Sequence, residues 1–161
     1  MVKIGETNIY VGTKEEYQTA RQKGMKIVCA LNRAKGYVSH QSVVGWSGKG
    51  CNKNNPHYLF KQQQNAIYLN MFDTNNPQHI KHEMINKTLS FMHNNLQNNE
   101  KVFVYCSKGE SRAPSIALMY MLEYNLVDKN NKPLTTFKNK LYPAYKPKKG
   151  IYLYIKNRWN L

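Results

Sequence analysis

The sequence predicts a single α/β domain over residues 1–161, with a central, mostly parallel sheet of four to five strands flanked by helices. Short apolar runs rich in β-branched residues alternate along the chain with stretches of helical spacing, which is typical of a parallel sheet. A length of 161 residues with 41% hydrophobic residues suffices for one core. No internal repeat or linker divides the chain.

The first part of the chain contains two predicted strands and one predicted helix. Residues 8–11 form a short strand that ends at a glycine. Thr13 and Glu16 then make a capping-box pattern, which opens a helix that ends near Gly24. The run KIVCALN at residues 26–32 is short, apolar and β-branched, as expected for a buried strand.

Residues 33–65 are rich in Gly, Asn, Ser and Gln and have no sustained periodicity, so they are predicted to form a long loop. A loop of this length inside a compact domain is usually functional or partly mobile. Its position predicts that it borders the ligand pocket and shapes substrate choice. Arg33, Lys35 and Tyr37 are candidates for contact with a substrate, and a solvated loop is an equally good interpretation.

The second part of the chain continues the alternation. AIYLNMF at residues 66–72 is the next predicted strand, and Asn76 with Pro77 provides an N-cap and a first-turn proline for a helix. KVFVY at residues 101–105 is a further buried strand, which leads into a helix over residues 112–125. Two more helical segments are expected near the end of the chain, at residues 136–141 and 150–159.

The net charge of +15, from 24 Lys+Arg against 9 Asp+Glu, predicts an acidic partner such as phosphate groups, nucleic acid or an anionic surface. Lys and Asn occur 20 times each, so a compositional bias of the source genome accounts for part of this charge. The stretch from Lys129 to Leu161 has nine basic residues and no acidic one. It is either a footprint for nucleic acid or acidic protein, or, more commonly, a solvated basic face.

The three cysteines, Cys29, Cys51 and Cys106, are an odd number at irregular spacing. This pattern disfavours a disulfide framework or a zinc site and favours a reducing, intracellular setting. The longest apolar run, from Ile116 to Leu122, is too short to span a bilayer. The sequence therefore predicts a soluble, cytoplasmic protein without a membrane span and without a metal site.

The segment CSKGESR, from Cys106 to Arg112, connects a predicted strand to a predicted helix. Such a loop points backbone N–H groups inward at a helix N-terminus, which makes a cradle for an anion. Gly109 permits the tight backbone, the local field favours the thiolate form of Cys106, and the Arg112 fork can hold two phosphate oxygens. These parts suit phosphoryl transfer through a phosphocysteine, for which no metal or cofactor is required.

The predicted substrate-binding residues are Ser107, Lys108, Gly109, Glu110, Ser111 and Arg112. Among them, Lys108 and Glu110 are expected to point outward and to tune local charge. The alternative interpretation is that Cys106 is an inert buried thiol and that Arg112 solvates a helix start.

A phosphocysteine route needs a proton donor for the leaving oxygen, and the same group can later activate water. Of the two Asp residues, Asp73 follows a core strand at the carboxyl edge of the sheet, where ligands usually bind. Asp128 lies beyond the Cys106 helix, at the opposite edge. Asp73 is therefore the predicted general acid, and it can also serve as a turn or cap residue before Asn76 and Pro77.

Residues 8–160 resemble a dual-specificity phosphatase of the cysteine-based protein tyrosine phosphatase superfamily. The similar segments are NIYVG, GMKIVCALN, AIYLNMFD, VYCSKGESRAPS and FKNKLYPAYKPKKGIYLYI. They resemble, in order, the family's first strand, its Gly-hydrophobic-Leu-Asn strand, its general-acid position, its His-Cys-x₅-Arg-Ser/Thr signature and its closing helical region. The resemblance implies one catalytic domain of the dual-specificity type, with Cys106, Arg112 and Asp73 in the catalytic roles.

Two departures from the family signature affect the chemistry. Tyr105 stands where the family usually has a His that helps to set the loop and the thiolate. Ala113 replaces a Ser or Thr whose hydroxyl eases loss of the thiolate from phosphocysteine. The second step is therefore expected to be slow, unless Ser111 or Ser115 substitutes.

Three functions stay open from the sequence. The first is a phosphatase that acts on phosphotyrosine, with or without phosphoserine and phosphothreonine, in proteins. The second is a phosphatase of the same mechanism that acts on RNA 5′ ends or another polyanion, although the RNA-directed branch usually has Thr-Gly after the Arg and Arg112 precedes Ala-Pro. The third is a weakly active phosphate-binding module, which retention of Cys106, Arg112 and Asp73 together argues against.

Overall fold

The computed structural model describes residues 1–32 and 53–161 of the chain. The strands are β1 (Val2–Lys3), β2 (Ile9–Thr13), β3 (Lys26–Cys29), β4 (Phe60–Gln62), β5 (Ala66–Leu69) and β6 (Val102–Cys106). The α-helices are α1 (Tyr17–Gln22), α3 (His82–Gln97), α4 (Arg112–Glu123), α5 (Pro133–Thr136) and α6 (Lys149–Trp159). Short 3₁₀ helices form η1 (Lys14–Glu16) and η2 (Pro77–His79), and η3 (Phe137–Leu141) is a π-helical segment.

The strands form one sheet in the order β1-β2-β6-β3-β5-β4. The four inner strands are parallel, and the edge strands β1 and β4 pair antiparallel with their neighbours. The predicted α/β class and mostly parallel sheet are confirmed, but the described residues form a sheet of six strands rather than four to five. The two extra strands have only 2 and 3 residues, which is too short for a hydrophobic pattern to show.

Strand β4 lies within residues 33–65, so the prediction of one continuous loop there was wrong for residues 60–62. Strand β4 is stabilised by antiparallel pairing with the buried strand β5. This is a tertiary contact, and the local composition of the segment does not encode it. Residues 33–52 lie outside the described part of the chain, and with them the candidate contacts Arg33, Lys35 and Tyr37.

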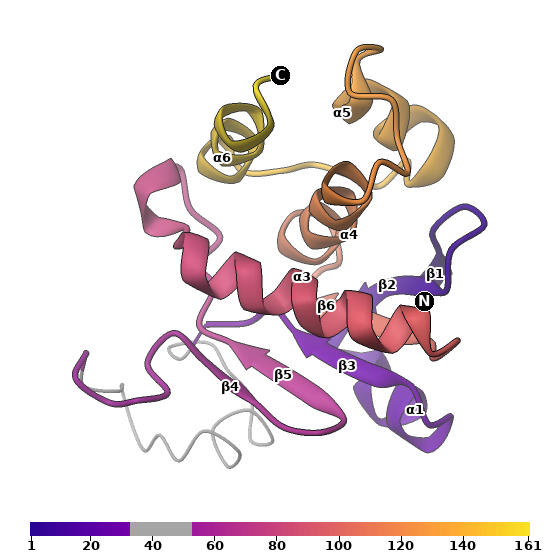
Figure 1. Ribbon diagram of the computed structural model, residues 1–161, viewed down its shortest axis with the longest axis vertical. Coiled ribbons are helices and arrows are strands. Elements are labelled where there is room, and N and C mark those ends of the chain that lie inside the picture. The colour runs from indigo at the N-terminus through magenta and orange to yellow at the C-terminus, as the bar shows by residue number, and fades with distance from the viewer. Residues whose placement is uncertain (33–52) are drawn as a thin grey trace.

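Helices cover both faces of the sheet, with α1 on one face and α3 and α4 on the other (Figure 1). Helix α4 is buried along its length from Arg112 to Leu122 because it packs between the sheet, α3 and α6. This packing explains why the helix is apolar nearly all round rather than along one stripe. Within the described ranges, no helix combines the length and apolar character that crossing a bilayer requires.

The predicted helix starts are correct in chemistry but not in helix type. Thr13 and Glu16 form the capping box, with the Thr13 N–H donating to Glu16 Oε1 at 3.0 Å, yet the first turn is the 3₁₀ helix η1. Asn76 Oδ1 accepts from the Gln78 N–H at 3.0 Å, but this cap opens η2. The backbone at Lys81 is extended, which separates η2 from the next helix, and α3 therefore begins at His82.

The helix predicted at residues 136–141 is likewise different. Pro133 occupies the first turn of α5, and the chain continues from α5 into the π-helical segment η3. A proline at the first helical position costs no backbone hydrogen bond, which explains the earlier start.

The parallel strands bring their carboxyl ends to one edge of the sheet. Thr13 at the end of β2 lies opposite Cys106 at the end of β6, and Cys29 at the end of β3 lies opposite Tyr105. Because side chains alternate along a strand, Tyr105 and Cys29 pack on the α1 face and Cys106 lies on the α4 face. Cys29 and Cys106 therefore point to opposite sides, which disfavours a disulfide between them.

Candidate active site

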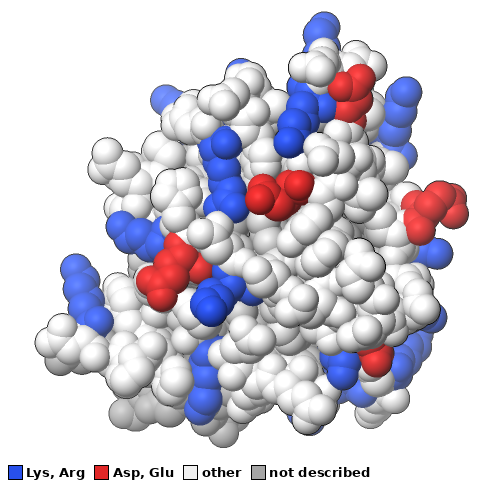
Figure 2. Space-filling model, viewed as in Figure 1, with Lys and Arg blue, Asp and Glu red and all other residues white. Residues whose placement is uncertain are grey.

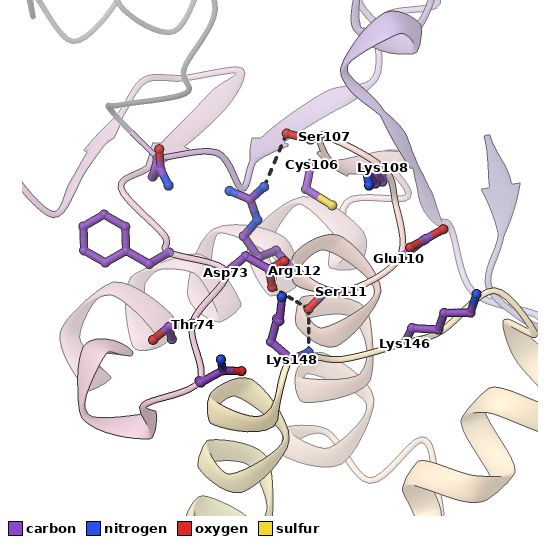
Figure 3. Close-up of a pocket in the computed structure, with 13 residues that line it drawn as sticks. Asp73, Thr74, Cys106, Ser107, Lys108, Glu110, Ser111, Arg112, Lys146 and Lys148 are labelled. Atoms are coloured by element: carbon purple, nitrogen blue, oxygen red, sulfur yellow. Dashed lines mark hydrogen bonds between the residues drawn. The ribbon is translucent and has the colours of Figure 1, made fainter. Parts of the chain in front are cut away.

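A cavity of about 700 Å³ opens at the carboxyl edge of the sheet (Figure 3). Its walls come from the end of β3, the segment after β5, the β6–α4 loop and the segment before α6. The lining residues are Asn32, Phe72, Asp73, Thr74, Asn75, Cys106, Ser107, Lys108, Glu110, Ser111, Arg112, Lys146 and Lys148. The three residues predicted to be catalytic thus line one cavity.

The β6–α4 loop is held from behind through Gly109. Its backbone has a φ of +68°, and an added Cβ would lie 3.2 Å from the Gly12 carbonyl oxygen. The Tyr142 hydroxyl donates to the Gly109 carbonyl at 2.7 Å. Burial raises the pKa of Tyr142 to about 12, so the hydroxyl stays protonated and keeps donating. Gly109, which was predicted to bind substrate, does not line the cavity and instead shapes the loop.

Cys106 ends β6 immediately before this loop, and its residue is 2% exposed. The Ala113 N–H, in the first turn of α4, donates to Cys106 Sγ at 3.5 Å. The first turn of α4 therefore presents a backbone donor to the sulfur. Cys29 lies in the interior of the sheet, where burial raises its pKa to about 12 and keeps it a neutral thiol.

Arg112 is the buried cation of the cavity, with 5% of its surface exposed. Its Nη1 donates to the Met71 carbonyl at 3.2 Å, and its Nη2 donates to Ser107 Oγ at 3.4 Å. Among the described residues, no carboxylate forms an ion pair with it. Burying a guanidinium without a counter-ion carries a free-energy penalty, so binding of an anion beside Arg112 would be favourable.

Asp73 lines the cavity beside the β6–α4 loop and is exposed. The Ser111 hydroxyl donates to Asp73 Oδ1 at 2.7 Å and accepts from the Lys148 backbone N–H at 3.0 Å. These two bonds connect the carboxylate to the β6–α4 loop and to the segment before α6 (Figure 3). The position of the carboxylate is therefore set by three parts of the chain.

The turn that follows Asp73 uses other groups. Thr74 Oγ1 accepts from the Asn76 N–H at 3.0 Å, and Asn76 supplies the cap of η2. Asp128 has the turn role that was considered for Asp73, since its Oδ1 accepts from the Asn130 N–H at 2.9 Å. Asp128 does not line the cavity.

Two other residues of the β6–α4 loop, Lys108 and Glu110, were expected to point outward. Both line the cavity, and Lys108 is exposed whereas Glu110 is half-buried. Six lining residues were absent from the sequence prediction, namely Asn32, Phe72, Thr74, Asn75, Lys146 and Lys148. Asn32 and Phe72 end two predicted strands, and Thr74 and Asn75 follow the second of them, so their place at the carboxyl edge of the sheet is a usable signal. For Lys146 and Lys148, the sequence offered no indication of a place in the site beyond the positive charge of the segment KPKKG.

The two departures from the expected signature have different surroundings. Tyr105 is fully buried on the α1 face. Its ring stacks on Phe103 with the ring centroids 5.6 Å apart, and its centroid lies 5.4 Å from that of Tyr17. Ala113 brings no hydroxyl to the sulfur. The Ser115 hydroxyl pairs with the Tyr145 hydroxyl at 2.8 Å, and the Ser111 hydroxyl with Asp73, so both candidate substitutes are engaged elsewhere.

Comparisons with known proteins agree with this architecture. Human DUSP28 aligns with a TM-score of 0.68 at 13% identity, over 99% of this chain and 96% of that chain. A leucine rich repeat and phosphatase domain containing protein from Entamoeba histolytica has a TM-score of 0.57 at 14% identity, over 99% and 90% of the two chains. The human tyrosine phosphatase-like serine/threonine/tyrosine-interacting protein has a TM-score of 0.59 at 15% identity, over 94% and 90%. At these identities the likeness shows the fold.

A search of curated proteins found no match. The pattern of the family described as dual specificity phosphatase, catalytic domain, matches residues 9–140. This match includes the β6–α4 loop and Asp73 and covers well over half of the chain. The chain therefore belongs to the dual specificity phosphatase catalytic domain family.

Proposed function

We propose that the protein is a phosphomonoester hydrolase, most specifically a protein tyrosine or dual-specificity phosphatase that works through phosphocysteine. The observation that carries the proposal is the buried Arg112, which has no ion-pair partner among the described residues and shares one cavity with Cys106. A phosphate dianion would satisfy this guanidinium and bring phosphorus to the sulfur. The proposal requires a reducing compartment, because oxidation of Cys106 would block attack.

In the first step, the Cys106 thiolate attacks phosphorus in line with the ester oxygen. The S–P bond forms as the P–O bond breaks, and Asp73 gives its proton to the departing alkoxide or phenoxide. Arg112 and the N–H groups of the loop hold the equatorial oxygens. The hydrogen bond from Ser111 to Asp73 at 2.7 Å supports this role, since it keeps the carboxyl on the side of the leaving group.

In the second step, water attacks the phosphorus of the phosphocysteine. The Asp73 carboxylate takes one proton from that water, the S–P bond breaks, and inorganic phosphate leaves while the thiolate is restored. The Ala113 N–H at 3.5 Å from Sγ is the contact that stabilises the returning thiolate.

A phosphate-binding module with negligible turnover is the second candidate. It is favoured by Ala113, and by the engagement of the Ser111 and Ser115 hydroxyls with Asp73 and Tyr145. In that case the first step would proceed and phosphocysteine would accumulate. Hydrolysis of RNA 5′ phosphates is motivated only by the overall charge of +15.

The test is a rapid-quench experiment on an aryl phosphate, with acid trapping of the phosphoenzyme and mapping of the phosphoryl group by mass spectrometry. The proposal expects a modification of Cys106 that forms and decays at rates compatible with turnover. Turnover of phosphotyrosine peptide, phosphothreonine peptide and RNA 5′-triphosphate is then compared side by side. Absence of a cysteine adduct during turnover would refute the mechanism, and an adduct that never decays would favour the binding module.

Asp73→Asn is expected to lower kcat/KM on a phenyl phosphate by about 10²-fold, because the leaving oxygen loses its proton donor in the first step. The loss should shrink with a leaving group of low pKa, which needs no protonation. Asp128→Asn makes the same chemical change in an exposed turn and serves as the matched control. Equal losses on both kinds of leaving group would contradict the assignment of Asp73 as general acid.

Ala113→Ser is expected to raise the steady-state kcat by about tenfold, since a hydroxyl beside the sulfur would stabilise the departing thiolate. The pre-steady-state burst of released phenol should shrink as the second step ceases to be limiting. Ala144→Ser, at an exposed position, is the control for the same substitution elsewhere. If both the burst and kcat stay as in the wild type, loss of the thiolate does not limit turnover.

A further inference from the structure

Residues 146–150, which lead into the first turn of α6, join the β6–α4 loop to the segment that carries Asp73. Its backbone donates alternately to the two sides of the cavity. The Lys146 N–H donates to the Glu110 carbonyl at 2.8 Å, and the Gly150 N–H donates to the Thr74 carbonyl at 3.0 Å. We call residues 146–150 the bridging segment.

The bridging segment is closely packed and has little freedom to move. A Cβ on Gly150 would lie 2.5 Å from both the Thr74 carbonyl oxygen and the Asn76 nitrogen, so only glycine allows this approach. Between the two anchors, the Lys148 N–H donates to Ser111 Oγ at 3.0 Å, and the same hydroxyl donates to Asp73. The backbone from which the side chains of this segment project is therefore held at a fixed place beside the site.

Two of those side chains, Lys146 and Lys148, line the cavity. In Figure 3 the Lys148 side chain runs toward Asp73 and Ser111, whereas Lys146 extends along the opposite side, toward the rim near Glu110. Both residues are exposed, and among the described residues neither forms an ion pair. Because Arg112 already serves the scissile phosphate, the two ammonium groups are additional cations at the entrance.

The place of Lys148 determines which part of a substrate it meets. Asp73 protonates the leaving oxygen in the proposed mechanism, so the side of the cavity near Asp73 faces the body of the substrate rather than the phosphoryl group. An ammonium group there would attract an anion that belongs to the leaving group. Asp73 itself carries a proton at the first step and does not then compete for the cation.

We infer that Lys148 forms a second anion subsite on the Asp73 side of the cavity, with Lys146 as a further cation at the rim, and that the preferred substrate is a phosphorylated protein segment with an acidic side chain next to the phosphorylated residue. The neighbouring anion can be an Asp or Glu carboxylate or a second phosphate. This inference rests on the proposed function, because it takes the Asp73 side of the cavity as the leaving-group side.

A protein segment fits this rim better than RNA does. A nucleic-acid site needs a continuous basic track and aromatic rings free to stack on bases. Here the carboxylates of Asp73 and Glu110 interrupt the basic rim, and Phe72 lies edge-on to His79 with ring centroids 6.3 Å apart. On the face drawn in Figure 2, acidic side chains also lie between several of the dispersed lysines and arginines.

The test compares two phosphotyrosine peptides that differ only in their neighbouring residues, acidic in one and neutral in the other. The measured quantity is the ratio of kcat/KM for the acidic over the neutral peptide. We expect Lys148→Gln to lower this ratio by about fivefold, and Lys146→Gln with Lys148→Gln to bring it close to one. Lys149→Gln, in the same segment but outside the cavity lining, is the matched charge control and should leave the ratio unchanged. A third peptide with a second phosphate distinguishes the source of the anion.

Two outcomes would overturn the inference. One is a ratio that the double variant leaves at the wild-type value. The other is a double variant that spares the peptide ratio but weakens hydrolysis of 5′-triphosphorylated RNA, which would assign the lysines to nucleic acid. Failure of the proposed function is recognised separately, as absence of turnover on a small aryl phosphate. In that event, titration of the same peptides onto the Cys106→Ser protein measures the lysine-dependent preference as a ratio of Kd values.

Discussion

Cys106→Ser is expected to lower turnover of an aryl phosphate by at least about 10⁴-fold, because a serine hydroxyl in this loop is not ionised and is a poor nucleophile. The substitution keeps the size and hydrogen-bonding capacity of the side chain, so the cavity and Arg112 should persist. The variant should still bind inorganic phosphate. The measurements are kcat on the aryl phosphate and a phosphate titration followed by calorimetry.

Cys29→Ala provides the cysteine control for this experiment. Cys29 is fully buried on the α1 face, and burial raises its pKa to about 12, so its thiol takes no part in the chemistry. Its loss should lower the melting temperature while turnover per folded molecule stays at the wild-type level. Turnover that survives in Cys106→Ser would show that the nucleophile is another group and would end the phosphocysteine proposal.

Arg112→Lys is the second change with a large expected effect, a loss of about 10³-fold in kcat/KM. A lysine keeps one positive charge but has no planar fork, so it cannot hold two equatorial oxygens at once. Arg112 also donates to the Met71 carbonyl at 3.2 Å and to Ser107 Oγ at 3.4 Å, and an ammonium group cannot reproduce both contacts in the same geometry. The variant should therefore lose the bidentate contact with the phosphate, and the β6–α4 loop should become less ordered.

Arg158→Lys is the matched control, since Arg158 lies on α6 with its Nη2 3.8 Å from Glu123 Oε2. That variant should keep wild-type kcat/KM. Thermal unfolding of both variants separates a loss of fold from a loss of phosphate binding. If Arg112→Lys stays within a few-fold of wild type, the loop amides rather than the guanidinium hold the phosphate.

The sequence predicted much of the fold because the inner strands are buried on both faces. The strand segments VFVYC and AIYL are buried at every position, and this makes them visible in the sequence without any knowledge of their neighbours. The same is true of the Cys106 to Arg112 loop, whose position between a buried strand and an apolar helix is a local feature. Asp73 was identifiable because the chain has only two aspartates and one of them follows a core strand.

The edge strands were missed for a physical reason. Strands β1 and β4 owe their conformation to pairing with β2 and β5, and each is too short to develop an alternating pattern. The helix type at η2 and η3 was also out of reach, since packing against distant elements decides where a turn tightens or widens. Intrinsic propensity does not contain that information.

The sequence by itself determined the α/β class, the parallel core and the order in which the acid, the thiol and the arginine follow along the chain. These features are local, because the burial of a strand and the chemistry of a loop are each visible in the residue types of that one segment. Only the tertiary structure decided that Arg112 is buried without an ion-pair partner among the described residues, that Ser111 connects Asp73 to the bridging segment, and that Lys146 and Lys148 line the cavity. The bridging segment lies about forty residues from Cys106 along the chain. Their proximity depends on the packing of α6 and the segment before it against the Asp73 side of the site, and no stretch of sequence specifies such a contact alone.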